Sequence, residues 1–164
     1  MLPGQPMRIF CKASPSLNAA VRGDRVVLVR ADPSDESQHW IQDHDSVGRV
    51  TDEQGRRAFA LVNVATGQAL MHDTWDPRAQ ERAWNMQLAK APYRGHERVE
   101  LSKLWSQGVQ LDDDGFSEVR VIRNMAMTFN ALGGYAEEGA EVGLFNSEPS
   151  YHHAIWKIVP INSE

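Results

Sequence analysis

The chain has 164 residues, of which 41% are hydrophobic and 24% charged, and its net charge is −5 at pH 7. This composition is typical of one soluble globular domain with a core of its own. The acidic balance, without any cluster of Lys or Arg, disfavours nucleic acid and anionic membrane surfaces as partners.

The first third of the chain predicts a series of short β-strands that ends at a tryptophan. Residues 1–6 contain two prolines and a glycine and are expected to form a flexible lead-in. Apolar and β-branched runs at 8–13, 17–21 and 25–30 alternate with turn residues, as strands do. A polar loop then leads to Gln38-His39-Trp40, which closes the unit.

The same arrangement occurs twice more. The second unit has predicted strands at 58–62, 68–72 and 84–88, and a longer loop at 90–101 precedes Trp105. The third unit has predicted strands at 119–122, 125–129, 142–145 and 154–159, the last of which contains Trp156. Three similar units in one short chain indicate an internally repeated fold.

The predicted fold class is all-β. No stretch of ten or more residues combines helical periodicity with caps. Twelve strands in three four-strand units predict a β-trefoil, a closed barrel capped by hairpins with pseudo-threefold symmetry, because closure removes exposed sheet edges. We expect residues 7–160 to form this domain, residues 161–164 to form a short tail, and the three tryptophans to occupy equivalent places near the floor of the barrel.

Several of these residues also carry a family resemblance. Residues 50–55 and 58–72 resemble the Euonymus-lectin (EUL) domain of the ricin-B-like plant lectins, which include the rice stress- and abscisic-acid-responsive ricin-B-like lectins. Further landmarks are Gln38-His39-Trp40, Leu104-Trp105, Gly115-Phe116, Phe129-Asn130-Ala131 and residues 156–160. The resemblance covers nearly the whole chain. It implies a trefoil that binds galactosides, mannosides or N-glycan fragments, in the cytoplasm and nucleus, with a role in stress responses.

The resemblance places a carbohydrate site in the third repeat. Asn130 falls at the family's acidic position, Phe145 near its stacking aromatic, with Asn146 beside it, and His153 near the Asn of its Asn-Gln-x-Trp element. A sugar needs a polar group for its ring hydroxyls and an aromatic for its apolar face. The repeat departs from the family in having Asn for Asp, in lacking a Trp in the stacking segment, and in having Ala154 in place of Gln.

The first repeat is expected to be structural. Ala19 and Ala20 lie where the acidic residue should be, and Val29 lies near the stacking position. Gln38 and Trp40 are therefore interpreted as scaffold residues.

The second repeat also departs from the family pattern. Met71 and His72 replace the acidic residue, and Leu88 lies near the stacking position. A cluster of Trp75, His72 and Asp73 remains as an alternative binding surface in this repeat.

Other polar motifs are expected to be structural. Residues 43–46 contain the residue types of a catalytic triad, but a solvated turn is favoured because triad residues must converge in space. The run 112–115 lacks the ligand spacing of a calcium loop and is also interpreted as a solvated turn. His152 and His153 are expected to lie in a strand and to point to opposite faces, which disfavours a metal site. Cys11, the single cysteine, excludes an intrachain disulfide, fits a reducing compartment, and is expected to be a buried apolar residue.

The sequence thus predicts a lectin-like protein that is not an enzyme and uses no cofactor or metal. Expected partners are glycans of the galactose, mannose or N-glycan type, with neither nucleic acid nor membrane among them. No apolar run approaches the ~20 residues of a membrane helix, and the first residues lack the pattern of a signal peptide. The alternative is a decayed lectin that acts as a protein-interaction scaffold without binding sugar.

Overall fold

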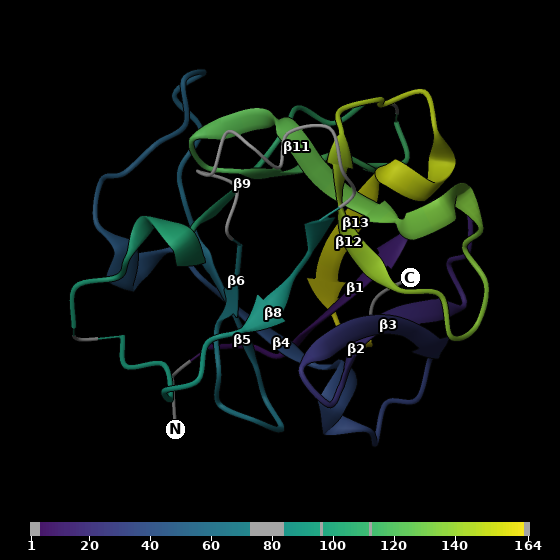
Figure 1. Cartoon of the computed structure of the whole chain (residues 1–164), viewed down its shortest axis with the longest axis horizontal. Helices are drawn as coiled ribbons and strands as arrows, with labels where there is room; N and C mark the ends of the chain where they lie inside the picture. Colours follow the sequence, from purple (N-terminus) through teal and green to yellow (C-terminus); the bar gives the residue numbers. More distant parts are fainter. Residues whose placement is uncertain (1–3, 73–83, 96, 112, 163–164) are drawn as a thin grey trace.

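A computed structural model describes residues 4–72, 84–95, 97–111 and 113–162 (Figure 1). Within these ranges the regular structure consists of β-strands and short 3-10 turns, and no helix is long and apolar enough to cross a membrane. The strands are β1 (Met7–Cys11), β2 (Leu17–Arg22), β3 (Arg25–Arg30), β4 (Trp40–Asp43), β5 (Ala60–Asn63), β6 (Leu70–Met71), β7 (Trp84–Asn85), β8 (Gln87–Leu88), β9 (Trp105–Gln107), β10 (Val119–Val121), β11 (Asn124–Ala131), β12 (Val142–Asn146) and β13 (Trp156–Pro160). The 3-10 turns are η1 (Glu36–Gln38), η2 (Asp45–Val47), η4 (Leu101–Lys103), η5 (Leu132–Gly134) and η6 (His152–Ala154).

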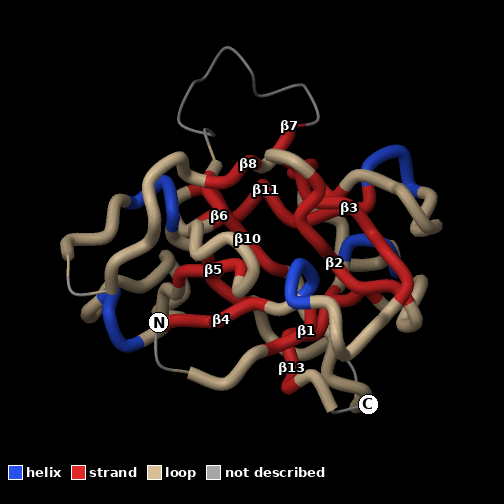
Figure 2. Tube along the Cα trace, turned by 90° about the horizontal axis from the view of Figure 1, so that it is seen from below, coloured by secondary structure: helices blue, strands red, loops and turns tan. Residues whose placement is uncertain are grey.

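Six strands close into a barrel. Strands β13, β1, β4 and β5 are hydrogen-bonded in that order, and β9 pairs with β10. Two bridges join these groups, Phe59 with Trp105 and Ser117 with Trp156. The second bridge has N–H···O distances of 3.0 and 2.7 Å. The strands gather at the centre of the molecule, with loops and 3-10 turns around them (Figure 2).

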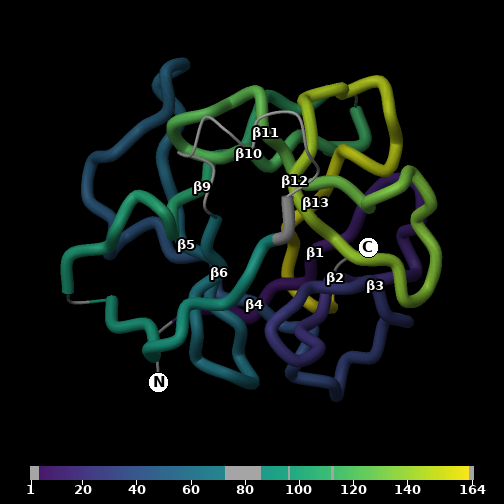
Figure 3. The backbone as a smooth tube through the Cα atoms, viewed as in Figure 1, coloured from purple at the N-terminus to yellow at the C-terminus, as the bar shows by residue number. Residues whose placement is uncertain are grey.

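Three antiparallel hairpins accompany the barrel and define three lobes. The pairs are β2 with β3, β6 with β8, and β11 with β12. The first lobe therefore spans residues 7–43, the second 58–107 and the third 117–160, and they occupy separate sectors of the molecule (Figure 3). The additional short strand β7 pairs with β12 and so links the second lobe to the third. This arrangement is the predicted β-trefoil.

Each of the three hairpins is held to the barrel by one tryptophan. Trp40, Trp105 and Trp156 are the first residues of β4, β9 and β13, and each is 0% exposed. Their indole N–H groups donate to backbone oxygens in β2, β6 and β11, namely those of Ala19 (2.9 Å), Leu70 (3.2 Å) and Phe129 (2.9 Å). The predicted equivalence of the three tryptophans is confirmed.

An aromatic column joins the lobes through the core. The ring of Phe129 lies edge-on to Trp105 at 4.9 Å and to Trp156 at 6.1 Å. Cys11, on β1, is 0% exposed, and burial raises the pKa of its thiol. The prediction that this cysteine is a buried apolar residue is therefore confirmed.

Two strand boundaries in the third lobe were predicted wrongly. β11 continues through Asn130 to Ala131, two residues beyond the predicted strand end at residue 129. His152 and His153 lie in the 3-10 turn η6, not in a strand, and β13 begins only at Trp156. The turn is closed by its own backbone bond, from the Ala154 N–H to the Tyr151 oxygen at 3.0 Å. The carbonyl of His152 also accepts from the N–H of Ala13.

The solvated turn predicted at 43–46 is wrong for its first residue. Asp43 is only 8% exposed, and its carboxylate accepts the backbone N–H groups of Asp45 and Ser46. It also accepts the Tyr93 hydroxyl at 2.8 Å. Burial raises the pKa of Tyr93, and the hydrogen bond to Asp43 raises it further, so the phenol stays protonated. This bond attaches the loop at 90–101 to the end of β4.

The acidic run at 112–115 is a turn, as predicted, for the residues that the structure describes. Asp112 lies outside them, and Gly115 adopts φ 85°. The Asp114 carboxylate lies 3.0 Å from the Lys12 ammonium, with 42% and 25% of the two side chains exposed. Such an exposed pair contributes little to stability.

A buried ion pair joins the segment between the first and second lobes to the third lobe. Asp52 follows β4 in a turn, and its side chain is 0% exposed. Its carboxylate lies 2.8 Å from Arg120 on β10, whose side chain is 7% exposed. Burial by itself would raise the pKa of Asp52, but hydrogen-bond donors and the Arg120 charge outweigh burial and lower the pKa. The carboxylate is therefore ionised at neutral pH.

Removing one of the indole hydrogen bonds should lower the stability of the fold. Trp156→Phe leaves the buried Phe129 carbonyl without its donor, and we expect a loss of about 1–3 kcal/mol in the free energy of unfolding. Urea denaturation measures this loss. Tyr135→Phe is the control. Tyr135 is 73% exposed, so removing its hydroxyl group should leave the midpoint unchanged. A Trp156→Phe midpoint equal to that of the control contradicts the role assigned to these bonds.

The ion pair predicts a pH-dependent cost. Arg120→Met leaves a buried carboxylate unpaired, and we expect a loss of about 3–5 kcal/mol at pH 7. In the native chain, the stability from the lowered pKa of Asp52 is present above the ordinary value of ~3.9 and is lost as pH falls. In the variant the unpaired carboxyl gains stability on protonation. The difference between the two proteins should therefore shrink toward pH 3 in urea titrations, and a constant difference would refute this account.

Candidate functional site

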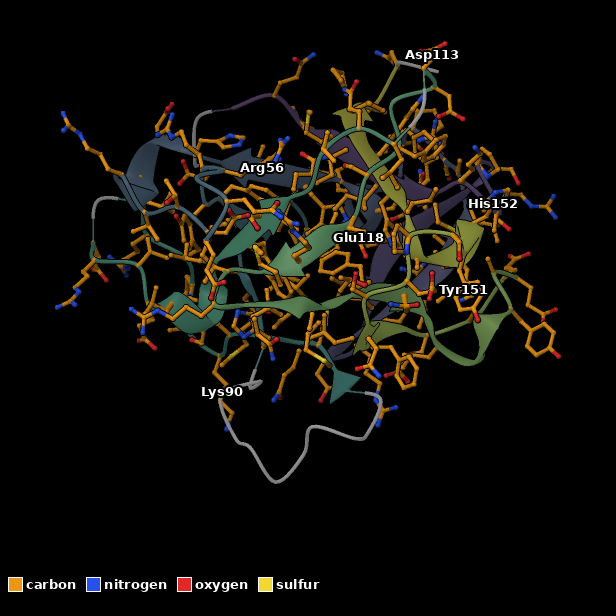
Figure 4. The ribbon with its side chains drawn as sticks, turned by 90° about the horizontal axis from the view of Figure 1, so that it is seen from above. Arg56, Lys90, Asp113, Glu118, Tyr151 and His152 are labelled. Carbon is orange, nitrogen blue, oxygen red and sulfur yellow. The ribbon has the colours of Figure 1, made fainter. Side chains whose placement is uncertain are left out.

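A cavity of about 590 Å³ opens on the third lobe, between the end of β11, the end of β12 and the loop that leads to β13. All four residues predicted from the sequence line it: Asn130, Phe145, Asn146 and His153. Figure 4 shows Tyr151, another lining residue, beside His152 and away from Arg56 and Lys90. The remaining lining residues are Ala131, Leu132, Gly133, Gly134, Ser147 and Glu148.

Asn130 provides a fixed acceptor in this cavity. It is the penultimate residue of β11 and is 4% exposed. Its Nδ2 donates to the backbone oxygen of Thr128 at 3.0 Å and to the Thr128 hydroxyl at 3.1 Å. No described residue donates to its Oδ1. Because the amide nitrogen is already bonded, Asn130 offers a ligand its carbonyl oxygen.

Two exposed aromatic side chains lie on the same cavity. Phe145 pairs with Thr128 across the hairpin and is 44% exposed, because β12 leaves the core after Leu144. Tyr151 is 55% exposed. Large aromatic rings are costly to leave in water, and they suit the apolar face of a flat ring-shaped ligand.

His153 forms part of the wall. Its imidazole stacks on Tyr151, with ring centroids 5.1 Å apart and an interplanar angle of 18°. Gly134 borders the same ring, and a Cβ there would lie 3.7 Å from Cε1, an ordinary van der Waals contact. Burial lowers the pKa of His153, so the ring is neutral at pH 7 and can both donate and accept a hydrogen bond.

The two glycines of η5 shape the opposite edge. Gly133 and Gly134 both have φ of 82°, a conformation that other residues rarely adopt. The chain can therefore turn sharply after Ala131, and the two glycines line the cavity with backbone atoms alone.

The polar loop at the rim is largely satisfied internally. The Ser147 hydroxyl donates to Glu118 at 2.5 Å, and the Glu148 carboxylate accepts the Ser150 hydroxyl at 2.7 Å. Glu148 supplies the cavity's single lining carboxylate. The arrangement therefore suits recognition by hydrogen bonds and stacking.

Sequence reasoning missed Tyr151, Glu148 and the two glycines of η5. The signals were present: two adjacent glycines follow Asn130 closely, and an aromatic residue stands two positions before His153. The stack of Tyr151 on His153 could not be predicted, because it depends on the 3-10 turn that replaces the expected strand.

Only the third lobe combines these residue types. The indole bonds align the lobes, so Asn130 corresponds to Ala20 and Met71, one residue after each accepting carbonyl. By the pairing of each hairpin, Phe145 corresponds to Val29 and Ala89. His153 lies three residues before its tryptophan, and the residues at that spacing in the other lobes are Ser37 and Ser102.

This alignment corrects the stacking position predicted for the second lobe. Leu88 pairs with Leu70, as Leu144 pairs with Phe129, and it packs in the core at 8% exposure. The position equivalent to Phe145 is Ala89, which has no ring to stack.

The first lobe is filled by its own side chains. Gln38 is 1% exposed, and its Oε1 accepts from Asn18 at 2.6 Å. Asn18, one residue before the predicted Ala19 and Ala20, is therefore the polar hairpin residue of this lobe. The prediction that Gln38 and Trp40 are scaffold is confirmed by their burial and bonds.

The third lobe has Thr128 at the position of Asn18 and Ala154 at the position of Gln38. Thr128 is 0% exposed and bonds Asn130 instead. The third lobe thus lacks the glutamine of the first lobe, and Thr128 supports the polar side chain of Asn130 in its place.

The alternative surface in the second lobe is only partly described. Asp73 and Trp75 lie outside the described residues. His72 is 6% exposed, with its Nε2 3.2 Å from the Leu104 oxygen and its ring edge-on to Trp105 at 4.8 Å. The His72 imidazole therefore belongs to the packing around that tryptophan.

Known proteins resemble this chain in sequence. No family model matches it. A ricin B-like lectin of rice (Oryza sativa subsp. japonica) is 36% identical over 134 residues, which cover 81% of this chain and 61% of that protein. The ricin B-like lectin EULS3 of Arabidopsis thaliana is 29% identical over 159 residues, which cover 94% of this chain and 47% of that protein. The chain thus spans about half the length of the curated relatives it matches.

Solved structures share the fold. The Macrolepiota procera ricin B-like lectin in complex with lactose matches with a TM-score of 0.67 at 12% identity, over 98% of each chain. A mosquitocidal holotoxin matches with a TM-score of 0.71 at 13% identity, over 97% of this chain and 17% of that one. The β-trefoil and the resemblance to ricin B-like lectins are confirmed.

The stack on His153 predicts a measurable titration. Tyr151→Ala should expose the imidazole and raise its pKa toward the ordinary ~6.5, as followed by NMR of the histidine ring protons. His44, whose pKa is also lowered by burial, lies elsewhere and serves as an internal control. Because the folded-state pKa lies below the unfolded value, His153 costs stability as pH falls through ~6.5, and the variant should reduce that cost. An unchanged His153 titration would contradict the stack.

Proposed function

We propose that this chain binds carbohydrate and that the third-lobe cavity is its glycan site. The observation that carries the proposal is the combination, in this lobe alone, of a carbonyl acceptor at Asn130, an aromatic at Phe145 and a neutral imidazole at His153. The equivalent positions of the other two lobes hold Ala, Met, Val and Ser.

The residues suit a sugar ring in complementary ways. The C–H face of the sugar stacks on Phe145 or Tyr151, while a ring hydroxyl donates to Asn130 Oδ1. A second hydroxyl exchanges a hydrogen bond with His153. Each hydroxyl left unpaired on binding costs about 1–3 kcal/mol, so a site with few polar groups binds weakly, in the micromolar to millimolar range.

The relatives guide the choice of ligand. The curated relatives are named as lectins, and the fungal neighbour was solved with lactose. Galactosides are therefore the first probe, and mannosides and N-glycan fragments the next. We propose that binding is not followed by catalysis, because glycosidases need two flanking carboxyl groups and the cavity presents Glu148 alone.

One observation favours a second candidate. Ala154 stands where the first lobe has Gln38, and the third lobe lacks a stacking tryptophan. A decayed lectin, which keeps the fold but binds a protein in place of sugar, accounts for these losses. Silence across a glycan array would favour it.

The cellular setting stays a prediction. A location in the cytoplasm and nucleus and a role in stress responses rest on the resemblance to plant lectins. Imaging of a fluorescent fusion in plant cells tests the location, and a signal confined to the secretory pathway would contradict it.

The decisive experiment is a glycan array followed by calorimetric titration of the best ligand. We expect Asn130→Ala and Phe145→Ala each to weaken binding about tenfold or more, because each removes one of the few contacts. Tyr135→Ala is the matched control, since this aromatic is 73% exposed and does not line the cavity. Unfolding midpoints of all variants show whether the fold is intact. Unchanged affinity in both site variants would sink the assignment of the site.

A further inference from the structure

A second hollow lies between two turns. One connects the first lobe to the second, and the other connects β10 to β11. Two adjoining cavities, of about 490 and 360 Å³, share Leu101, Ile122 and Arg123. We name them together the Arg98–Arg123 groove. Its other residues are Ser46, Val47, Gly48, Val50, Thr51, His72, Arg98, Val99, Ser102, Val121 and Asn124.

The groove is separate from the third-lobe cavity. The two share no lining residue. In Figure 1 the turns η2 (blue) and η4 (green) lie at the left, and η6 (yellow) lies across the barrel at the right. A ligand in one site therefore does not compete sterically with a sugar in the other.

The floor of the groove is apolar. Val47 and Ile122 are 7% and 2% exposed and belong to one small hydrophobic cluster, against which Val50 and Val99 pack. Leu101 adds an exposed apolar wall, with 36% of its surface accessible. Such a surface is suited to contact short aliphatic side chains of a partner.

The walls carry positive charge. Arg98 and Arg123 are exposed, and neither makes a hydrogen bond or ion pair with another described residue. Arg25 and Arg120, by contrast, pair with carboxylates. No carboxylate lines the groove, although the chain as a whole carries a charge of −5. Glu97 and Glu100 flank Arg98 in sequence but are not lining residues.

We propose that the Arg98–Arg123 groove binds an acidic peptide segment in which carboxylate side chains alternate with aliphatic ones. Guanidinium groups bind carboxylates through paired hydrogen bonds, and the apolar floor takes the aliphatic side chains. Nucleic acid fits less well: among the groove's lining residues there is no Phe, Tyr or Trp on which a base could stack, and the net charge repels a polyanion.

The probe is a fluorescein-labelled synthetic peptide with alternating leucine and glutamate, followed by fluorescence anisotropy with the full chain. The matched probe has lysine in place of glutamate. We expect saturable binding of the first and none of the second. Arg98→Glu and Arg123→Glu should each weaken binding about tenfold or more, since each removes charge-assisted hydrogen bonds and adds a carboxylate that repels the peptide.

Arg94→Glu is the control variant, because it changes the net charge equally and Arg94 lies in the same loop without lining the groove. It should weaken binding less than about twofold. Saturating amounts of any sugar found for the third-lobe cavity should leave peptide binding unchanged, which separates this proposal from the glycan site. Equal loss with Arg94→Glu, equal binding of the lysine peptide, no binding, or tighter binding of single-stranded RNA would each overturn it.

Discussion

Three indole N–H groups, each donating to a carbonyl in the first strand of a hairpin, hold the lobes to the barrel. The hairpins pack beside the barrel, and the third-lobe hairpin is also paired with it through β10 and β11. The tryptophans supply a buried, directional bond at equivalent places, and burial away from water strengthens it. In the third lobe the accepting residue, Phe129, directly precedes Asn130, so the same bond fixes the candidate site.

The threefold frame leaves each lobe's corner free to diverge. In the first lobe Asn18 and Gln38 satisfy each other and fill the corner. In the second, His72 packs on Trp105. In the third, Thr128 holds Asn130, and two glycines with positive φ keep the corner open beside two exposed aromatic rings. The closed corner of the first lobe and the open corner of the third therefore differ in only a few side chains. The hydrogen bond from the indole to the hairpin carbonyl is the same in both.

Charge is used differently on the two sides of the molecule. Two buried carboxylates, Asp43 and Asp52, are satisfied by Tyr93 and Arg120 and attach loops to the barrel. Arg98 and Arg123 pair with no described residue and border an apolar floor. The third-lobe cavity instead presents a neutral imidazole and an amide. The two proposed sites share no lining residue, so occupation of one would not block the other sterically.

Much of the fold follows from the sequence, because alternating apolar runs, turn residues and the three tryptophans report local structure directly. The four site residues also follow, but from resemblance to lectins whose motifs are spaced alike. Only the tertiary structure decided the interactions between residues far apart in the chain. These are the Asp52–Arg120 pair, the Tyr93–Asp43 bond and the grouping of Arg98 with Arg123. The turn at His152–Ala154 also belongs here. Its residues have no helical pattern, and its backbone contact with the β1–β2 loop is one that no local signal records.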